Sequence, residues 1–201
     1  MKLYYTPGAC SLASHIVAAE ACLPLQLVKV DLKEHRCEDG TDFNAINIKG
    51  YVPALVLDDG QTLTEGVAIM QYLADQTPAS GLAPACGTMA RYRLQEWLTF
   101  VSSEVHKTFG PLWNPAIPEE IKQGARDRLA RRFAWLDQEL AARAYLMGDT
   151  FTAADAYLFT VVNWCGFHNV DLSPYANLRA FMDRVRGREK VRQALQAEGL
   201  V

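Results

Sequence analysis

The apolar positions of residues 1–76 alternate between two periods along the chain. Apolar side chains fall at alternate positions or in short β-prone runs at Lys2–Tyr5 and Leu25–Leu32, which predicts two strands. The segment between them repeats apolar residues on one helical face, at Leu12, Ile16, Val17 and Leu23. Asp58-Asp59-Gly60 marks a hairpin turn between two further short strands, and a helix comes next. The order β-α-β-α-β-β-α predicts an α/β unit with helices packed on a sheet.

The remainder of the chain has a helical pattern. Proline and glycine punctuate Thr77–Thr88, which predicts a linker at residues 79–87 between a first domain at 1–78 and a second at 88–201. Apolar residues then repeat at helical spacing in two long stretches, Leu94, Trp97, Leu98, Val101 and Val105, and Leu129, Phe133, Leu136 and Leu140. Tyr157–Val162 is almost wholly apolar, so this helix should form the buried centre of an all-helical domain.

Composition and charge exclude several classes of protein. The 201 residues are 50% apolar and 21% charged, which is ordinary for a folded chain and unlike a disordered one. The net charge of −3 gives no electrostatic footprint for nucleic acid or anionic lipid. No run reaches the ~18 apolar residues of a membrane span, and the first residues lack the apolar core of a signal peptide. We therefore expect a cytoplasmic protein with no membrane or nucleic-acid partner.

The five cysteines set the candidate chemistry. Their odd number and irregular spacing predict no disulfide framework, and the absence of zinc-like spacing predicts no metal site. Cys10 differs from the others because it stands between a strand end and a helix start, where free N–H groups and the helix dipole lower a thiol pKa and favour thiolate. The alternative is a small buried apolar residue. Ala13 stands where a resolving cysteine would be, which disfavours a thioredoxin-type dithiol cycle.

Four motifs succeed one another in the order found in cytosolic glutathione transferases. They are Tyr4-Tyr5-Thr6-Pro7-Gly8-Ala9-Cys10-Ser11, Val52-Pro53-Ala54-Leu55, Thr64-Glu65-Gly66-Val67-Ala68-Ile69 and Phe151-Thr152-Ala153-Ala154-Asp155-Ala156-Tyr157. The Pro-Gly-Ala-Cys start and the run Glu104–Lys107 resemble the bacterial beta class of that family. The resemblance spans essentially the whole chain. It implies a thioredoxin-like N-terminal domain, an all-α C-terminal domain and a homodimer.

The resemblance also implies a site. Cys10 takes the catalytic role that other classes give to a Tyr or Ser. His106, which lies near it together with Lys107, is implied as the second catalytic residue, because a histidine can hold or move a proton at neutral pH. Glutathione is the co-substrate and no other cofactor is expected. The residues implied to bind glutathione are Cys10, His35, Val52, Pro53, Glu65, Gly66, Thr99, Ser103, Glu104, Val105 and His106. Glu104 matches a position that reaches the glutathione of the partner subunit.

Two of these positions depart from the pattern of the class. His35 stands where a lysine that helps to bind the glycyl carboxylate is common. A neutral imidazole can still donate a hydrogen bond, so the departure bears on glutathione affinity and not on the fold. Thr99 stands where asparagine is often found.

The proline of Val52-Pro53 is one that the family holds cis, which leaves the Val52 backbone free to pair with the cysteinyl backbone of glutathione.

Some of the implied site residues also have a purely structural interpretation. Pro53 could begin an edge strand as an ordinary trans proline. Glu65 could act only as an acidic residue in the first turn of a helix. Thr99, Ser103 and His106 fall on one polar helical seam, at i, i+4 and i+7, which could be a solvated face.

Aromatic and capping residues of the second domain could also have either a functional or a purely structural role. Trp113 and Trp164 are candidates for lining a pocket for the electrophile, but core packing is the favoured interpretation for both. Thr152-Ala153-Ala154-Asp155 has the pattern of a capping box, with Thr at the N-cap and Asp three residues later. We interpret this motif as structural.

The function that the sequence favours is that of an enzyme. It would add the glutathione thiol to small, largely apolar electrophiles, and Cys10 would support thiol–disulfide exchange or reductive removal of halide. The alternative is a non-catalytic protein that binds glutathione or hydrophobic ligands, or acts as a scaffold, because fold does not fix function. Turnover of a chromogenic electrophile with glutathione separates the two.

Overall fold

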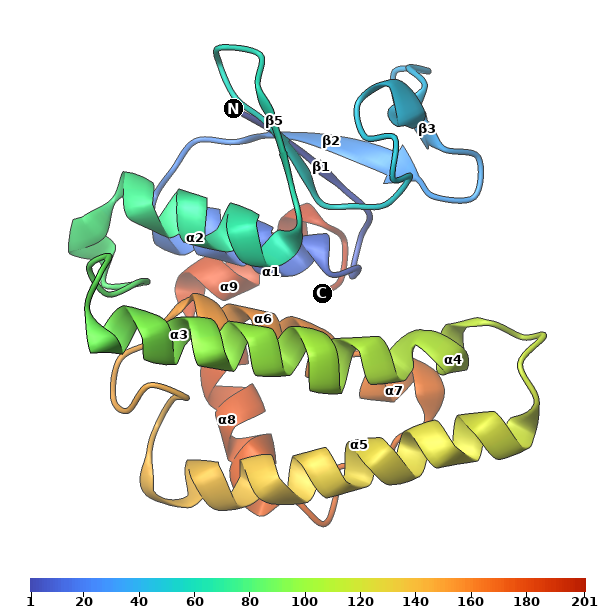
Figure 1. The fold of residues 1–201 in the computed structure, drawn as a ribbon, viewed down its shortest axis with the longest axis vertical. Coiled ribbons are helices and arrows are strands. Elements are labelled where there is room, and N and C mark those ends of the chain that lie inside the picture. Colours follow the sequence, from blue (N-terminus) through green and yellow to red (C-terminus); the bar gives the residue numbers. More distant parts are fainter. The chain divides into compact units, whose positions relative to one another are not determined.

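The computed structural model describes residues 1–201 and divides them into two compact units (Figure 1). The first unit holds Met1–Ala83 together with Gly187–Val201, and the second holds Pro84–Arg186. Each unit has its own buried apolar core. The first is an α/β unit and the second is all-helical, so the expected fold class is confirmed.

A five-stranded mixed sheet forms the frame of the first unit. Its strands are β1 (Lys2–Tyr5), β2 (Gln26–Asp31), β3 (Arg36–Cys37), β4 (Ala54–Val56) and β5 (Thr62–Thr64), in the order β3-β2-β1-β4-β5. β1 runs parallel to β2 and antiparallel to β4, and the two edge pairings are antiparallel. The parallel pair needs a crossover connection, which the helix between β1 and β2 supplies. The predicted strands and the hairpin between β4 and β5 are confirmed.

Two helices, α1 (Ser11–Glu20) and α2 (Gly66–Gln76), lie side by side on one face of this sheet (Figure 1). Their apolar faces are sealed from water, with exposures of 2% or less at Leu12, Ile16, Val17, Ile69, Met70 and Leu73. Burial of such a side chain stabilises the fold by ~1.5–3 kcal/mol. These two helices therefore fix the position of the strand ends and loops that carry the site.

The last helix, α9 (Glu189–Ala197), belongs to the first unit, which differs from the expected domain at 88–201. The physical reason is its apolar stripe of Val191, Ala194 and Leu195, which is 3% exposed or less and packs with α1. Arg188, just before α9, also forms a two-pronged ion pair with Glu20 at the end of α1, at 2.6 and 2.8 Å. An amphipathic pattern shows that a helix is packed but does not show its partner.

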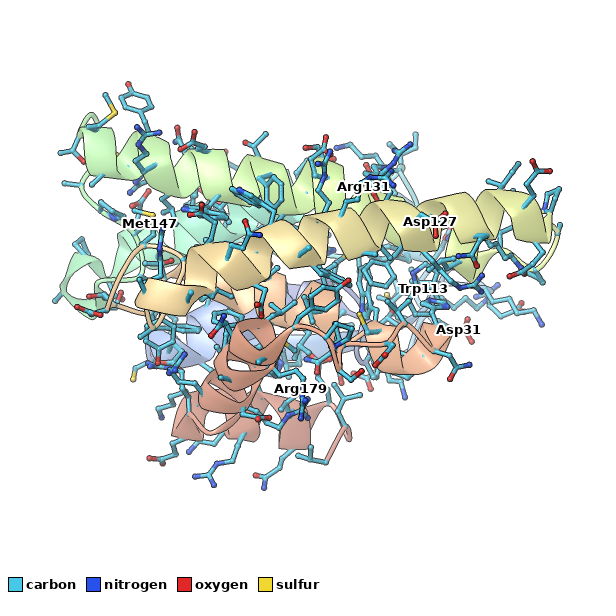
Figure 2. All side chains as sticks on the ribbon, turned by 90° about the horizontal axis from the view of Figure 1, so that it is seen from below. Asp31, Trp113, Asp127, Arg131, Met147 and Arg179 are labelled. Atoms are coloured by element: carbon cyan, nitrogen blue, oxygen red, sulfur yellow. The ribbon has the colours of Figure 1, made fainter.

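The second unit consists of helices around one buried helix. They are α3 (Met89–Phe100), α4 (Gly110–Trp113), α5 (Glu119–Glu139), α6 (Ala153–Val162), α7 (Cys165–His168) and α8 (Ala176–Arg186). Every residue of α6 is buried, as its apolar run predicts. The outer face of α5 carries exposed charges such as Asp127 and Arg131 (Figure 2). No helix is long and apolar enough to cross a membrane.

The helix that begins with α3 changes its geometry before it ends. Val101–His106 forms a π-helical turn, and Lys107–Phe109 continues as 3₁₀ helix. The regular spacing expected for Thr99, Ser103 and His106 does not hold, because a π turn contains more residues than an α turn and shifts the helical phase of the later residues. Thr99 and Ser103 are exposed, whereas His106 is half-buried against α6. Single π turns of this kind often occur at functional sites.

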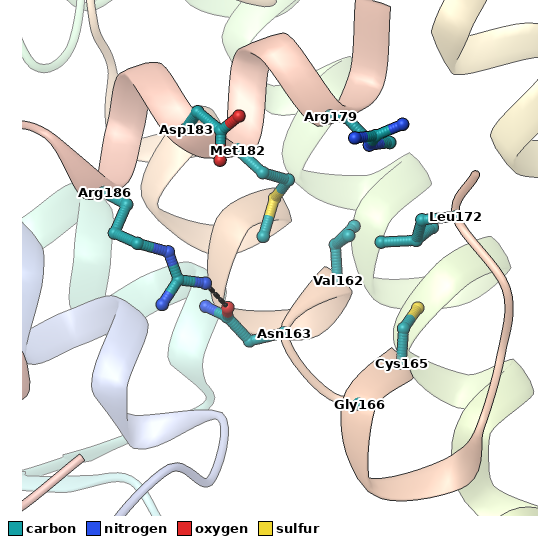
Figure 3. A pocket seen from close by; sticks show the side chains of 9 residues that line it. All are labelled: Val162, Asn163, Cys165, Gly166, Leu172, Arg179, Met182, Asp183 and Arg186. Carbon is teal, nitrogen blue, oxygen red and sulfur yellow. Dashed lines mark hydrogen bonds between the residues drawn. The ribbon is translucent and has the colours of Figure 1, made fainter. Parts of the chain in front are cut away.

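A cavity of about 330 Å³ opens between the end of α6 and α8 (Figure 3). The Cys165 thiol lies in its wall, and burial raises the pKa of that thiol to about 12. At the rim, Arg186 donates a hydrogen bond to Asn163 at 2.7 Å. None of the implied site residues lines this cavity. Cys165 is therefore an inert buried thiol, as its sequence context suggests.

Candidate active site

A tight turn between β1 and α1 carries the candidate nucleophile. The chain leaves β1 at Tyr5, turns with a hydrogen bond from the Ala9 N–H to the Thr6 carbonyl, and enters α1 directly after Cys10. Gly8 has a φ of +71°, a conformation that glycine adopts without strain. Cys10 occupies the N-cap position of α1 and its side chain makes no capping hydrogen bond. The predicted place of Cys10, between a strand and a helix start, is confirmed.

The Cys10 thiol is held in its protonated form. Its Sγ donates a hydrogen bond to the Val52 carbonyl at 3.2 Å, and a hydrogen bond from the thiol favours the neutral state. Burial raises the pKa of the thiol to about 11, and the Glu65 charge adds to this. The N–H groups of Cys10 and Ser11 lower the pKa, as the sequence predicts for a helix start, but they do not outweigh burial. The expected pKa below that of a free cysteine is therefore wrong for this structure.

The Val52–Pro53 loop lies against the thiol. Its peptide bond is cis, as the resemblance implies. No hydrogen bond within the chain reaches the Val52 N–H, so this donor is open to a ligand backbone. The Val52 carbonyl is already used by Cys10, which the sequence did not predict. A Cβ at Gly66 would come within 3.7 Å of the Pro53 ring, so the start of α2 packs closely on this loop.

Glu65 precedes α2 in a strained conformation. Its φ is +70°, which a residue other than glycine rarely adopts, and such strain is concentrated at functional sites. Its carboxylate accepts hydrogen bonds from the Lys49 ammonium at 2.5 Å and the Tyr51 hydroxyl at 3.0 Å. These bonds raise the pKa of both Lys49 and Tyr51. Sequence reasoning missed these two partners, although both stand within three residues before Val52.

His35 lies in the turn between β2 and β3. Its φ is +50°, and its Nδ1 is buried without a hydrogen-bond partner. Gly50 packs on the ring, because a Cβ there would come within 3.0 Å of the imidazole Cε1. A buried polar atom without a partner costs free energy, so His35 is held here at some cost to stability.

His106 lies among aromatic side chains of the second unit. Its Nδ1 is 2.6 Å from the Tyr157 hydroxyl of α6, and its ring packs edge-on against Trp164 with centroids 4.8 Å apart. Burial, helped by the charge of Lys107, lowers the pKa of His106 to about 4. The imidazole is therefore neutral at pH 7, with Nε2 making no hydrogen bond within the chain. Tyr157 is a further partner that sequence reasoning missed.

The other implied residues of the second unit are engaged within their own helices or core. Glu104 accepts two hydrogen bonds from the Arg132 guanidinium of α5, at 2.9 and 2.5 Å. The Ser103 hydroxyl donates to the Thr99 carbonyl one turn earlier, at 3.0 Å. Val105 is fully buried, so its side chain belongs to the core. A ligand could therefore reach only backbone groups and the exposed parts of the Thr99, Ser103 and Glu104 side chains.

Of the two tryptophans proposed for the electrophile pocket, Trp164 is buried in the core and Trp113 is half exposed. Trp164 is 4% exposed and Trp113 is 50% exposed, and their rings meet edge-on with centroids 5.6 Å apart. The favoured interpretation of core packing is confirmed for Trp164 and is wrong for Trp113, half of whose side chain remains exposed. Trp113 also meets the His168 ring at 4.2 Å and thus presents an aromatic face at the surface of the second unit.

The interpretation of Thr152–Asp155 as a capping box is confirmed. Asp155 is fully buried and accepts hydrogen bonds from the Thr152 N–H at 2.7 Å, the Thr152 hydroxyl at 2.8 Å and the Leu146 N–H at 2.8 Å. Burial raises the pKa of Asp155 to about 6. The carboxylate therefore fixes the start of α6 and the loop before it, and has no free oxygen for catalysis.

A thioredoxin-like unit with a cysteine at its first helix start and a cis-proline loop against the thiol, joined to an all-helical unit, defines the class of cytosolic glutathione transferases. Family models agree over both parts of the chain. The model of the glutathione S-transferase N-terminal domain matches residues 8–76, and that of the C-terminal domain matches residues 100–189.

Individual relatives extend the match over the whole chain. Glutathione S-transferase GstA of Escherichia coli O157:H7 is 48% identical over 100% of both chains. A sphingomonad glutathione S-transferase solved with glutathione is 47% identical, with a TM-score of 0.96 over 100% of both chains. The beta-class enzyme of Sphingomonas chungbukensis is 46% identical, with a TM-score of 0.97 over 100% of both chains. This chain belongs to the glutathione S-transferase family, and the predicted likeness to its bacterial beta class is confirmed.

Proposed function

We propose that this chain is a glutathione S-transferase that joins the glutathione thiol to small, largely apolar electrophiles. The observation that carries the proposal is the full-length match to a relative solved with glutathione, combined with the open backbone donor and the cysteine at one place in the first unit. In conjugation, the glutathione sulfur forms a bond to an electrophilic carbon and the leaving group, such as halide, departs with the bonding electrons. The protein orients the two reactants and stabilises the thiolate.

The proposed glutathione site uses the residues that surround the thiol turn. Val52 would pair with the cysteinyl backbone of the peptide, and its open N–H supports this assignment. Glu65 would accept the α-amino group, with the free N–H groups at the start of α2 near Gly66 taking the carboxylate beside it. His35 would donate to the glycyl carboxylate through its imidazole ring, as the resemblance implies.

Cys10 is the proposed nucleophile for exchange with a disulfide of glutathione. After loss of its proton, the Cys10 sulfur attacks the glutathione sulfur of a disulfide between glutathione and another thiol, the S–S bond breaks, and the other thiol leaves as thiolate. A second glutathione thiolate then attacks the mixed disulfide on Cys10, which releases the Cys10 thiolate and oxidised glutathione. The neutral His106 has a lone pair or a proton at Nε2, depending on its tautomer, and is the proposed proton carrier.

The proposed assembly is a homodimer in the cytoplasm. Large apolar side chains are exposed on the outer face of the second unit. Trp97 stacks on Trp135 with centroids 5.4 Å apart, Phe100 meets Trp135 at 4.7 Å, and Tyr92 on α3 is 57% exposed. An exposed aromatic patch of this kind marks an interaction surface. In the dimer, Glu104 would approach the glutathione of the partner, and sedimentation should give twice the mass of the chain.

The test compares two exposed glutamates that each form an ion pair. Glu65→Ala should weaken glutathione binding about tenfold or more, because it removes a hydrogen bond to a charged group. Glu96→Ala, which breaks the surface pair with Arg93 on α3, should leave binding unchanged. Calorimetric titration measures affinity, and a chromogenic haloaromatic electrophile measures turnover. Glutathione binding without turnover of haloaromatic, peroxide or disulfide substrates would favour the non-catalytic alternative, and absence of binding would exclude both.

A further inference from the structure

The C-terminal segment carries a buried carboxylate that has no part in the proposed chemistry. Glu198 comes directly after α9, and its side chain is fully buried within the first unit. One carboxylate oxygen accepts a hydrogen bond from the Gly8 N–H at 3.0 Å, and the other lies 2.9 Å from Nδ1 of His15. Because a carboxylate can only accept, His15 donates through Nδ1. The C-terminus accordingly lies beside the start of α1 (Figure 1).

Both partners of Glu198 belong to the element that presents the thiol. Gly8 is two residues before Cys10 in the β1–α1 turn, and His15 lies on α1 five residues after it. Leu200 adds an apolar contact, because a Cβ at Gly8 would come within 3.4 Å of its methyl group. The turn before Cys10 therefore continues directly into α1. Glu198 and Leu200, which are far from the turn in sequence, contact it at Gly8.

α9 has a second anchor on α1 besides Glu198. The opposite end of α1 is already joined to the segment before α9 by Arg188 and Glu20, with two hydrogen bonds. The apolar stripe of α9 packs along α1 between these two anchors. Of the two anchors, only Glu198 reaches the turn that precedes Cys10. The chain thus holds a matched pair of carboxylates, one at the thiol end of α1 and one away from it.

We propose that Glu198 is a positioning residue that holds the Thr6–Cys10 turn through Gly8, with His15 fixing the orientation of its carboxylate. The turn aims the Cys10 sulfur at Val52, and Glu198 restrains the turn. This inference rests on the proposed function for its kinetic consequence, since a small displacement of a reacting group slows catalysis steeply. The structural consequence of the inference, which is the protection of the Cys10 thiol from alkylation, does not depend on the proposed function.

The experiment compares Glu198→Ala with Glu20→Ala in the full chain. Both changes should lower the melting temperature, because each removes an anchor of α9. Only Glu198→Ala should lower kcat for glutathione-dependent disulfide exchange, by about tenfold to hundredfold. Only Glu198→Ala should also speed alkylation of Cys10 by iodoacetamide, by about tenfold for each unit that its pKa falls. Glu198→Gln retains an acceptor and should restore most of the rate.

If Glu198→Ala is too unstable to purify, His15→Gln replaces it in the test. This variant keeps the hydrogen bond between Glu198 and the Gly8 N–H, so it should speed the alkylation of Cys10 in the same direction but by a smaller factor. Equal alkylation of Cys10 in wild type, Glu198→Ala and His15→Gln would overturn the inference. So would equal kcat losses in Glu198→Ala and Glu20→Ala. If no variant, nor the wild type, shows exchange or conjugation, the proposed function fails, and the alkylation rates alone decide the role of Glu198.

Discussion

The two units start their key helices in opposite ways. α6 in the helical unit begins with a capping box, in which the buried Asp155 accepts hydrogen bonds from the Thr152 N–H and the Thr152 hydroxyl and also from the Leu146 N–H. α1 in the α/β unit begins with Cys10, whose side chain caps nothing and which has no acidic residue in the next turn. Both helices lie in well-packed cores, so the difference is not one of burial.

The difference lies in where the unsatisfied N–H groups of the helix end are used. At α6 the chain itself supplies an anion at the helix start, the buried Asp155 carboxylate. At α1 the chain supplies a thiol whose hydrogen bond points away to Val52, so the positive end of the helix is left for an external anion or a thiolate. A capped helix start is a structural device, whereas an uncapped one that is held in place from elsewhere is available for chemistry.

Removing Asp155 should have the largest effect on stability. Asp155→Ala leaves three polar groups without their acceptor, two of them buried backbone N–H groups, and should lower the free energy of unfolding by about 3 kcal/mol. Cys10→Ala, at the corresponding place on α1, should lower it by no more than about 1 kcal/mol, because it removes a single neutral hydrogen bond. Urea denaturation of both variants measures this contrast. Equal losses would show that α1 also depends on its first residue.

The thiol of Cys10 should behave as a protonated group until the solution is strongly alkaline. With a pKa of about 11 instead of an ordinary value of 9.0, it holds about 100-fold less thiolate at neutral pH. At pH 7, iodoacetamide should therefore label the exposed Cys22 and Cys86 before Cys10, and the Cys10 rate should keep rising up to pH 11. Peptide mapping by mass spectrometry resolves the sites. Labelling that falls first on Cys10 at pH 6 would show that the helix start outweighs burial.

Local patterns in the sequence predicted the elements and the place of Cys10 in the fold. The strand alternation, the DDG hairpin, the capping box and the place of Cys10 each depend on neighbouring residues, and each is confirmed. The partners of Glu65 and Glu198 were missed because Lys49, His15 and Gly8 meet them only after the chain has folded. Proximity between segments far apart in sequence leaves no periodic signal.

Two errors have a more specific cause. The π turn at Val101–His106 shifts the helical phase by a fraction of a turn, and the buried positions Val101 and Val105 fit an α-helical pattern almost as well. The thiol pKa was misjudged because the helix dipole can be inferred from a motif, whereas desolvation depends on the groups that the finished fold places over the sulfur. Both errors concern the surroundings of a residue and not its identity.

The smallest effect concerns His106, the neutral group of the helical unit. Its pKa of about 4 in the folded chain lies below the ordinary 6.5, so between these values the unfolded chain binds a proton that the folded chain does not. The stability contributed by this group is present above pH 6.5 and is lost as the pH falls through 4. The change should amount to roughly 1–2 kcal/mol, since the imidazole is partly open to water and the full shift is screened.

Denaturation of wild type and His106→Gln at steps from pH 7 to pH 4 measures this loss as the difference between two curves. The difference matters because burial also lowers the pKa of His168, which adds a slope of the same sign to both proteins. The variant curve should be flatter than that of the wild type. Parallel curves would mean that His106 takes up its proton in the folded state, and then its hydrogen bond with Tyr157 would have to be one in which Nδ1 donates.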